Sequence, residues 1–134
     1  AERMQLRNSI DAPGAIRAEA APAWIRAADV GLYFPDYRSD YGFLGDPIKL
    51  YEFMACGRPI ATIRIKNFAD SVKAAEAGIF SEPMPEAFAE AIANLLNDPK
   101  AMAEAGERGA RAARERHTWD AVAQGIASVC RDVE

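Results

Sequence analysis

Short continuous apolar runs alternate with helical patterns over the first two thirds of the chain. Three of these runs predict buried strands, because their apolar residues are unbroken rather than alternating: residues 30–34, 59–63 and 79–80. Helical patterns precede or separate the runs, and glycine or proline marks their ends: residues 21–28, 47–56 and 67–77. This order predicts an α/β fold with a Rossmann-like parallel sheet flanked by helices. Such sheets bind ligands at the carboxyl ends of their strands.

The last third of the chain carries only helical patterns. Apolar residues at spacings of three and four predict a helix that Asp98-Pro99 closes: Phe88, Ile92, Leu95 and Leu96. A more polar helix follows over residues 100–116, and a last helix begins at Thr118, which resembles an N-cap. This last helix has one apolar face: Trp119, Val122, Ile126 and Val129. We expect Phe88 and Trp119 to be core residues.

Composition and charge exclude several classes of protein. The 134 residues fit one domain with a real core, and 50% of them are hydrophobic. The net charge of −4 and the lack of a lysine or arginine tract argue against a nucleic-acid binder. No apolar stretch is long enough to span a bilayer, and residues 1–4 do not resemble a signal peptide. We therefore expect a cytoplasmic protein.

Cysteine and histidine give no indication of a metal site. Cys56 and Cys130 lack the spacing of metal ligands, and we expect both to be reduced packing residues. His117 is the only histidine and stands just before Thr118, which favours a surface or interhelix role. We expect neither a metal nor a cofactor.

The helix over residues 47–56 is apolar on most sides but carries one charged stripe. Lys49, Glu52 and Cys56 stand at i, i+3 and i+7, so they share one side of the helix. Unpaired charges against a core are costly, and the stripe should therefore face water or a cleft. One interpretation is an exposed Lys49–Glu52 ion pair worth a few tenths of a kcal/mol. The other is a binding site, and the residues leave both open.

The start of this helix favours a phosphate group. Asp46 is a natural N-cap and Pro47 suits the first helical position. Free N–H groups and partial positive charge at a helix N-terminus attract anions, so the Ile48 and Lys49 amides can hold a diphosphate. One turn further on, the Glu52 carboxylate can accept hydrogen bonds from two adjacent hydroxyl groups, such as those of a ribose.

Four neighbouring side chains each have two interpretations. Tyr33, Tyr37 and Tyr41 lie near the end of the first strand and either stack on a base or sugar or pack within the loop. Arg58 follows the helix and either reaches a phosphate or is a solvated residue.

Several segments, in order, resemble the C-terminal half of a group-1 (family 4) glycosyltransferase. They read "ADVGLYFP", "DPIKLYEFMACGRPIAT", "AGIFSEP" and "PEAFAEAIANLLNDPKAMAEAGERGARAARERHTWDAVA". The resemblance runs from about Ala21 to the end, and residues 1–20 are a lead-in without a match. It implies one domain over residues 1–134, the incomplete C-terminal domain of the GT-B architecture of two facing Rossmann-like domains.

The resemblance also implies roles for residues of the 47–56 helix. Glu52 matches the second glutamate of the family's Glu-x7-Glu signature, which holds the nucleotide ribose. Ile48, Lys49 and Leu50 fall where backbone amides approach the diphosphate. The first glutamate falls at Leu44, and Asp40 and Asp46 lie at the wrong spacing to replace it.

The family's basic pair, which neutralises the departing diphosphate, has no counterpart before Ala21. We therefore assign no catalytic residue, and expect this chain alone to be inactive and to be part of a larger enzyme.

The implied activity is retaining hexosyl transfer from a UDP-, GDP- or ADP-sugar, without a required metal. The acceptor would be a sugar, a lipid-linked sugar or a small molecule bound through a missing N-terminal domain. Two further interactions stay open, a peripheral membrane contact by the basic segment 107–117 and a dimer that covers the sheet edge. Two other functions stay open as well: a nucleotide-sugar 2-epimerase-like enzyme and a non-catalytic α/β module that binds a protein.

Overall fold

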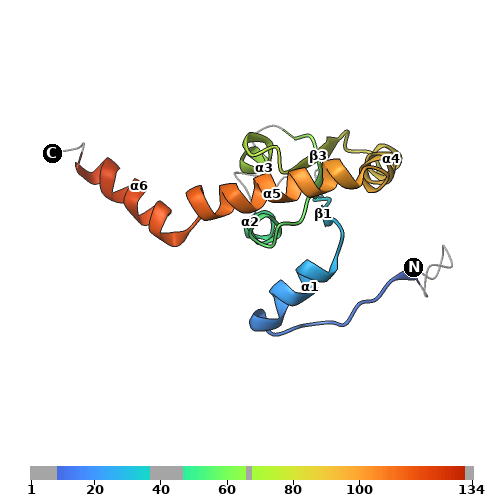
Figure 1. The fold of residues 1–134 in the computed structure, drawn as a ribbon, viewed down its shortest axis with the longest axis horizontal. Helices are drawn as coiled ribbons and strands as arrows, with labels where there is room; N and C mark the ends of the chain where they lie inside the picture. Colours follow the sequence, from blue (N-terminus) through green and yellow to red (C-terminus); the bar gives the residue numbers. More distant parts are fainter. Residues whose placement is uncertain (1–8, 37–46, 66–67, 132–134) are drawn as a thin grey trace.

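The computed structural model describes residues 9–36, 47–65 and 68–131. Figure 1 shows the elements in chain order. They are η3 (Ala18–Ala20), α1 (Ala21–Ala27), β1 (Gly31–Tyr33), α2 (Ile48–Ala55), β2 (Ile60–Ile63), α3 (Asp70–Ala74), β3 (Gly78–Ser81), α4 (Pro85–Leu96), α5 (Pro99–Arg116) and α6 (Trp119–Arg131).

The three strands form one parallel sheet in the order β1-β2-β3. Gly31 pairs with Ile60, and Ile60 pairs in turn with Gly78. The central strand β2 is buried along its whole length, as a strand covered on both faces must be. The prediction of an α/β parallel sheet flanked by helices is confirmed, and each strand lies within one residue of its predicted position.

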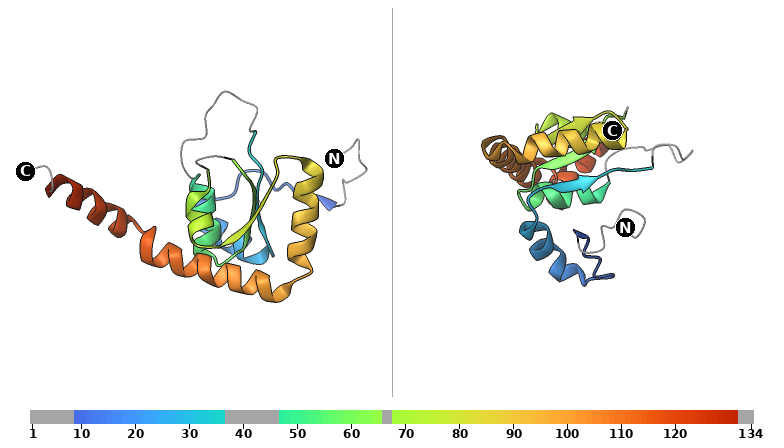
Figure 2. Two further views of the ribbon diagram at one scale, coloured as in Figure 1. Left: turned by 90° about the horizontal axis from the view of Figure 1, so that it is seen from above. Right: turned by 90° about the vertical axis from the view of Figure 1, so that its right-hand side faces the viewer.

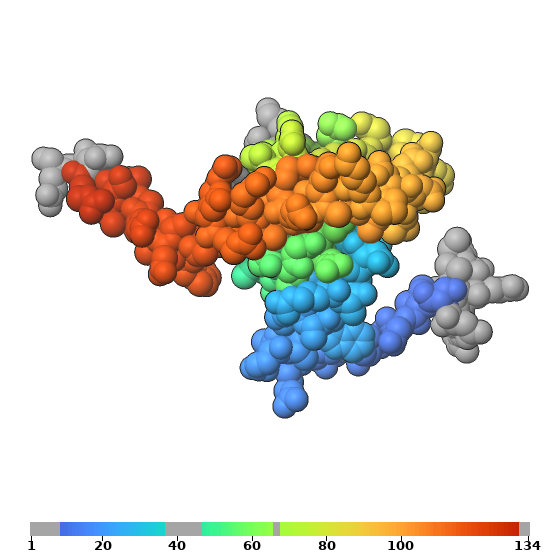
Figure 3. Space-filling view, in the orientation of Figure 1, coloured from blue at the N-terminus to red at the C-terminus, as the bar shows by residue number. Residues whose placement is uncertain are grey.

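Helices cover the sheet from both sides. Figure 2 (left) shows α2 and α3 on one side of the strands and α4 on the other. The long helix α5 crosses α2 (Figure 1) and also contacts β3. In Figure 3, α6 extends away from this body as an arm, and α1 projects from another side.

The core lies between the sheet and the helices α2, α3 and α5. Its largest fully buried side chains come from α2, β2 and α3: Leu50, Met54, Ile60, Ile63, Val72 and Thr62. Two glycines let α5 approach the turn after α2. A Cβ on Gly106 would lie 2.4 Å from the Gly57 carbonyl oxygen, and Gly57 has a φ of +68°, which suits glycine at the end of a helix. Gly57 ends α2 as predicted.

Two helix boundaries differ from the prediction. Pro47 is the N-cap of α2, with extended backbone, and the helix begins at Ile48. The predicted cap, Asp46, lies outside the described residues. Helix α3 is shorter than the predicted 67–77 segment because left-handed backbone bounds it, with a φ of 55° at Ala69 and 50° at Glu76. Gly78 opens β3 instead of ending the helix.

The prediction that Trp119 is a core residue is wrong. Its side chain is 83% exposed, because α6 leaves the body of the molecule after the α5–α6 turn. Phe88 is half-buried and its ring meets the Phe34 ring edge-on, with centroids 5.0 Å apart. Cys56 and Cys130 are free as predicted, but Cys130 is exposed on α6 and packs no core.

Candidate functional site

The amino end of α2 lies where a parallel α/β sheet binds ligands. Strand β1 ends at Tyr33 and the next described helix begins at Ile48. The chain leaves β1 at the carboxyl end of the sheet, and α2 therefore starts at that end. The first hydrogen bond at this end runs from the Leu50 N–H to the Pro47 carbonyl oxygen, at 3.0 Å. The Ile48 and Lys49 amides precede that bond, and they carry the partial positive charge of the helix end.

The two charges of α2 form an ion pair at the surface. Lys49 Nζ lies 2.6 Å from Glu52 Oε2, and the side chains are 47% and 40% exposed. The carboxylate is therefore open to solvent and to a solute. An exposed pair one turn apart contributes at most about 1 kcal/mol to stability. Hydroxyl groups of a ligand can therefore replace Lys49 at the carboxylate without a large cost to the fold.

The third member of the stripe, Cys56, does not share this open surface. Its thiol lies 4.0 Å from the Pro22 carbonyl oxygen, and the residue is half-buried against α1. The solvent-facing part of the stripe is therefore limited to Lys49 and Glu52.

The predicted site residues fall into three groups. Ile48, Lys49 and Glu52 lie together at the surface, and the Ile48 side chain is 68% exposed. Leu50 is fully buried and its amide already bonds to Pro47, so its part in the structure is to anchor α2. The remaining predicted residues lie outside the described part of the chain: Asp46, Asp40, Leu44, Tyr37 and Tyr41. Tyr33 stacks on Phe68 with ring centroids 5.8 Å apart, which places it in the packing of the fold.

A groove beside the amino end of α2 was not predicted. Its volume is about 310 Å³, and it is lined by residues of α2 and of the α5–α6 junction: Ile48, Tyr51, His117, Thr118, Trp119 and Val122. The rings of Tyr51 and His117 are 4.8 Å apart, which confirms the interhelix role of His117. The Thr118 hydroxyl accepts the Ala121 N–H at 3.1 Å and caps α6 as predicted. The spacing of apolar residues predicted the apolar faces of α2 and α6. It did not predict that these faces meet at a groove.

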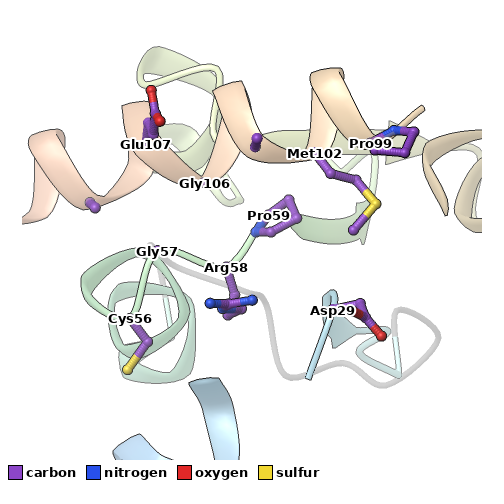
Figure 4. Close-up of a pocket in the computed structure, with 11 residues that line it drawn as sticks. Asp29, Cys56, Gly57, Arg58, Pro59, Pro99, Met102, Gly106 and Glu107 are labelled. Atoms are coloured by element: carbon purple, nitrogen blue, oxygen red, sulfur yellow. The ribbon is translucent and has the colours of Figure 1, made fainter. Parts of the chain in front are cut away.

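A second cavity, of about 460 Å³, lies at the opposite end of the sheet (Figure 4). It is lined by the turn after α2 and by α5, and its charged residues are Asp29, Arg58 and Glu107. Arg58 donates from Nη1 to the Ala28 carbonyl oxygen at 3.2 Å, which holds the segment before β1. Arg58 thus follows the carboxyl end of α2, away from the candidate phosphate site, and its role is structural.

Two kinds of site are absent from the described residues. Within residues 9–36, 47–65 and 68–131, no group of three histidine, cysteine or acidic side chains is placed to hold a metal. Nor does any helix in those ranges have the length and apolar character needed to cross a membrane.

The sheet, its crossover helices and the open amino end of α2 define a Rossmann-like α/β domain. Residues 1–98 match the family model described as glycosyl transferases group 1, and the chain belongs to this family. The matched range also includes residues 1–20, which the resemblance from the sequence does not cover. The resemblance stated from the sequence is therefore confirmed.

Two known proteins are similar to this chain. Sucrose-phosphate synthase from Thermosynechococcus elongatus superimposes with a TM-score of 0.80 and 24% identity, over 98% of this chain and 32% of its own. This match establishes the GT-B type of fold. D-inositol 3-phosphate glycosyltransferase 2 from Catenulispora acidiphila is 32% identical over 107 residues, 79% of this chain and 23% of the relative. The chain thus spans a quarter to a third of the proteins it matches.

Proposed function

We propose that this chain binds the nucleoside-diphosphate sugar in a retaining glycosyltransferase that is longer than the chain itself. The observation that carries the proposal is the exposed Glu52 carboxylate, one turn into a helix whose amino end opens at the carboxyl edge of the sheet. The group-1 family match supports glycosyl transfer as the reaction class. The acceptor, a sugar or lipid-linked sugar, would bind to another part of the enzyme, on the cytoplasmic side.

The arrangement of α2 suggests how the donor is held. The diphosphate lies against the Ile48 and Lys49 amides, where the dipole of the helix favours negative charge. The two oxygens of Glu52 accept hydrogen bonds from the vicinal hydroxyls of the ribose. When these hydroxyls replace Lys49 at Glu52, the ammonium group is released toward the phosphates. Lys49 then offsets part of the charge of the departing diphosphate, and electrostatic stabilisation of this kind is often the largest catalytic contribution.

Titration with UDP, GDP and ADP by calorimetry tests the proposal. We expect one of the three to bind, and Glu52→Gln to weaken it by about tenfold or more, because hydrogen bonds to charged groups contribute about 1.5–3 kcal/mol. Glu90→Gln, at an exposed position of α4, is the matched control and should leave the affinity unchanged.

The same titration distinguishes the proposed function from the alternative functions. If none of the three nucleotides binds, the proposed donor site is withdrawn and the result favours a non-catalytic module that binds a protein. If a nucleotide binds equally well to the Glu52→Gln variant, its ribose is held elsewhere and the role of Glu52 is withdrawn. Assays on the full-length enzyme then distinguish transfer to an acceptor from interconversion of free nucleotide sugars.

A further inference from the structure

Thr62 is a polar residue in the buried central strand β2. The strand reads Ile60-Ala61-Thr62-Ile63, and none of these four residues has any exposed surface. Valine has nearly the shape of threonine and would bury no polar group, whereas a buried hydroxyl group is costly unless it makes a hydrogen bond. The reason for a threonine here is therefore to be sought in the group that its hydroxyl bonds.

The Thr62 hydroxyl holds the carboxyl end of the neighbouring strand. It donates to the Tyr33 carbonyl oxygen at 2.8 Å, and the two residues are also partners in the parallel sheet. Tyr33 is the last residue of β1, which is only three residues long. Ligands bind to α/β sheets at this edge. The hydrogen bond thus fixes the point from which the chain leaves the sheet toward α2.

The Tyr33 side chain is held by the segment that follows β2. Its ring stacks on the Phe68 ring, with centroids 5.8 Å apart, and Phe68 is 2% exposed. Phe68 belongs to the core cluster that also contains Leu50, and Tyr33 packs against this cluster. Leu50 lies in the first turn of α2, where its N–H donates to the Pro47 carbonyl oxygen. A continuous series of contacts therefore leads from Thr62 through Tyr33 and the core to the first turn of α2.

We propose that Thr62 is a positioning residue for the amino end of α2. Its hydroxyl fixes the end of β1 at Tyr33, and the contacts of Tyr33 with the core then set the position of the Ile48 and Lys49 amides. The inference rests on the proposed function, because these are the amides assigned to the diphosphate. Thr62 has no exposed surface, so it acts on a ligand only through Tyr33 and Leu50.

Two substitutions of Thr62 separate positioning from packing. Thr62→Val keeps the shape and removes the hydroxyl, whereas Thr62→Ser keeps the hydroxyl and removes a methyl group. We expect Thr62→Val to raise the dissociation constant of the nucleoside diphosphate about fivefold, because the loss of one hydrogen bond changes an equilibrium constant by about two- to tenfold. Thr62→Ser should bind the nucleotide like the unaltered chain, although the lost methyl group lowers its midpoint of unfolding in urea.

Ile60→Val is the matched control, at the other end of the same strand. Ile60 is fully buried, and the substitution removes one methylene group from the core. It should lower the midpoint of unfolding in urea, as Thr62→Ser does, and leave the nucleotide affinity unchanged. Calorimetry on the folded 134-residue chain measures the affinity, and circular dichroism in urea measures the stability, so the two effects are obtained separately.

The amide signals of Ile48 and Lys49 in NMR spectra test the inference without a nucleotide. In the free chain we expect both signals to shift in Thr62→Val and to keep their positions in Thr62→Ser and Ile60→Val. If the unaltered chain binds neither UDP, GDP nor ADP, the proposed function fails. The two amide signals then still decide whether Thr62 positions the amino end of α2.

Three results would overturn the proposal. Unchanged Ile48 and Lys49 signals in Thr62→Val would show that the hydroxyl does not act on α2. Nucleotide affinity that falls equally in Thr62→Val and Thr62→Ser would assign the effect to packing alone. Should Thr62→Val fail to fold, Phe68→Leu tests the second contact of Tyr33. Loss of the stacked ring should shift the same two amide signals, and unchanged signals in this variant would exclude a path through Tyr33.

Discussion

At the scale of single residues, the exposed pair of Lys49 and Glu52 is the feature on which the donor site depends. The i, i+3 spacing was enough to predict that both side chains share one exposed stripe, and the structure places them there. Spacing alone gave no reason to separate Cys56 from that stripe, because the contact with Pro22 comes from a helix more than thirty residues away. The sequence therefore identified the charges but not the extent of the open surface.

Lys49→Ala tests whether Lys49 contributes only to the surface ion pair or also to the binding of a ligand. We expect the free energy of unfolding to change by less than about 1 kcal/mol, because the pair is exposed. The affinity for a nucleoside diphosphate should fall several-fold, while the affinity for the matching nucleoside should hardly change. Urea denaturation and calorimetry measure the two effects, and Lys73→Ala, exposed on α3, is the control. An equal loss for nucleoside and nucleotide would show that Lys49 does not act on the phosphates.

At the scale of elements, local pattern predicted the strands and most helices closely. The unbroken apolar runs predicted the bounds of β1, β2 and β3 to within one residue. A strand buried on both faces is apolar along its length, so its limits are clear in the sequence. Helix α3 was predicted too long, since nothing in its composition indicates left-handed backbone at Ala69 and Glu76. The face of α6 was predicted correctly, but an amphipathic pattern does not say what covers it.

Replacing Gly78 or Gly125 by alanine should change the stability of the protein in opposite directions. A Cβ on Gly78 would lie 1.9 Å from the Ile60 carbonyl oxygen of the neighbouring strand, whereas a Cβ on Gly125 would meet nothing within 4 Å. We expect Gly78→Ala to destabilise the fold by more than about 3 kcal/mol, because backbone must move. Gly125→Ala should favour α6 by up to about 1 kcal/mol. Urea denaturation and helical circular dichroism of both variants test this, and a stable Gly78→Ala protein would contradict the close strand contact.

At the scale of the whole molecule, the sheet forms a body from which α1 and α6 project (Figure 3). Sequence patterns could not predict this shape, because it depends on where α5 ends relative to α2. The two tryptophans of the chain, Trp24 and Trp119, lie one on each projection, and both are about half exposed or more. They therefore report on the two projections separately from the core.

Tryptophan fluorescence should reveal what happens to the α6 projection. In dilute solution we expect emission close to that of free tryptophan, because both side chains contact water. Acrylamide should quench Trp119 more strongly than Trp24, because the Trp119 side chain is 83% exposed and the Trp24 side chain 49%. A Trp24→Phe variant leaves Trp119 as the single reporter and should show the stronger quenching. A Trp119→Phe variant should show the weaker quenching, and equal quenching of the two variants would contradict the greater exposure of α6.

Ile48 belongs both to the amino end of α2 and to the wall of the groove. A nucleotide at the Ile48 amide and a molecule bound in the groove would therefore act on the same residue from two sides. Any energetic coupling between them must be reciprocal, since linkage requires the same factor in both directions. If a donor nucleotide tightens binding in the groove fivefold, binding in the groove tightens the nucleotide fivefold. The occupancy of the donor site would then depend on what occupies the groove as well as on how much nucleotide there is.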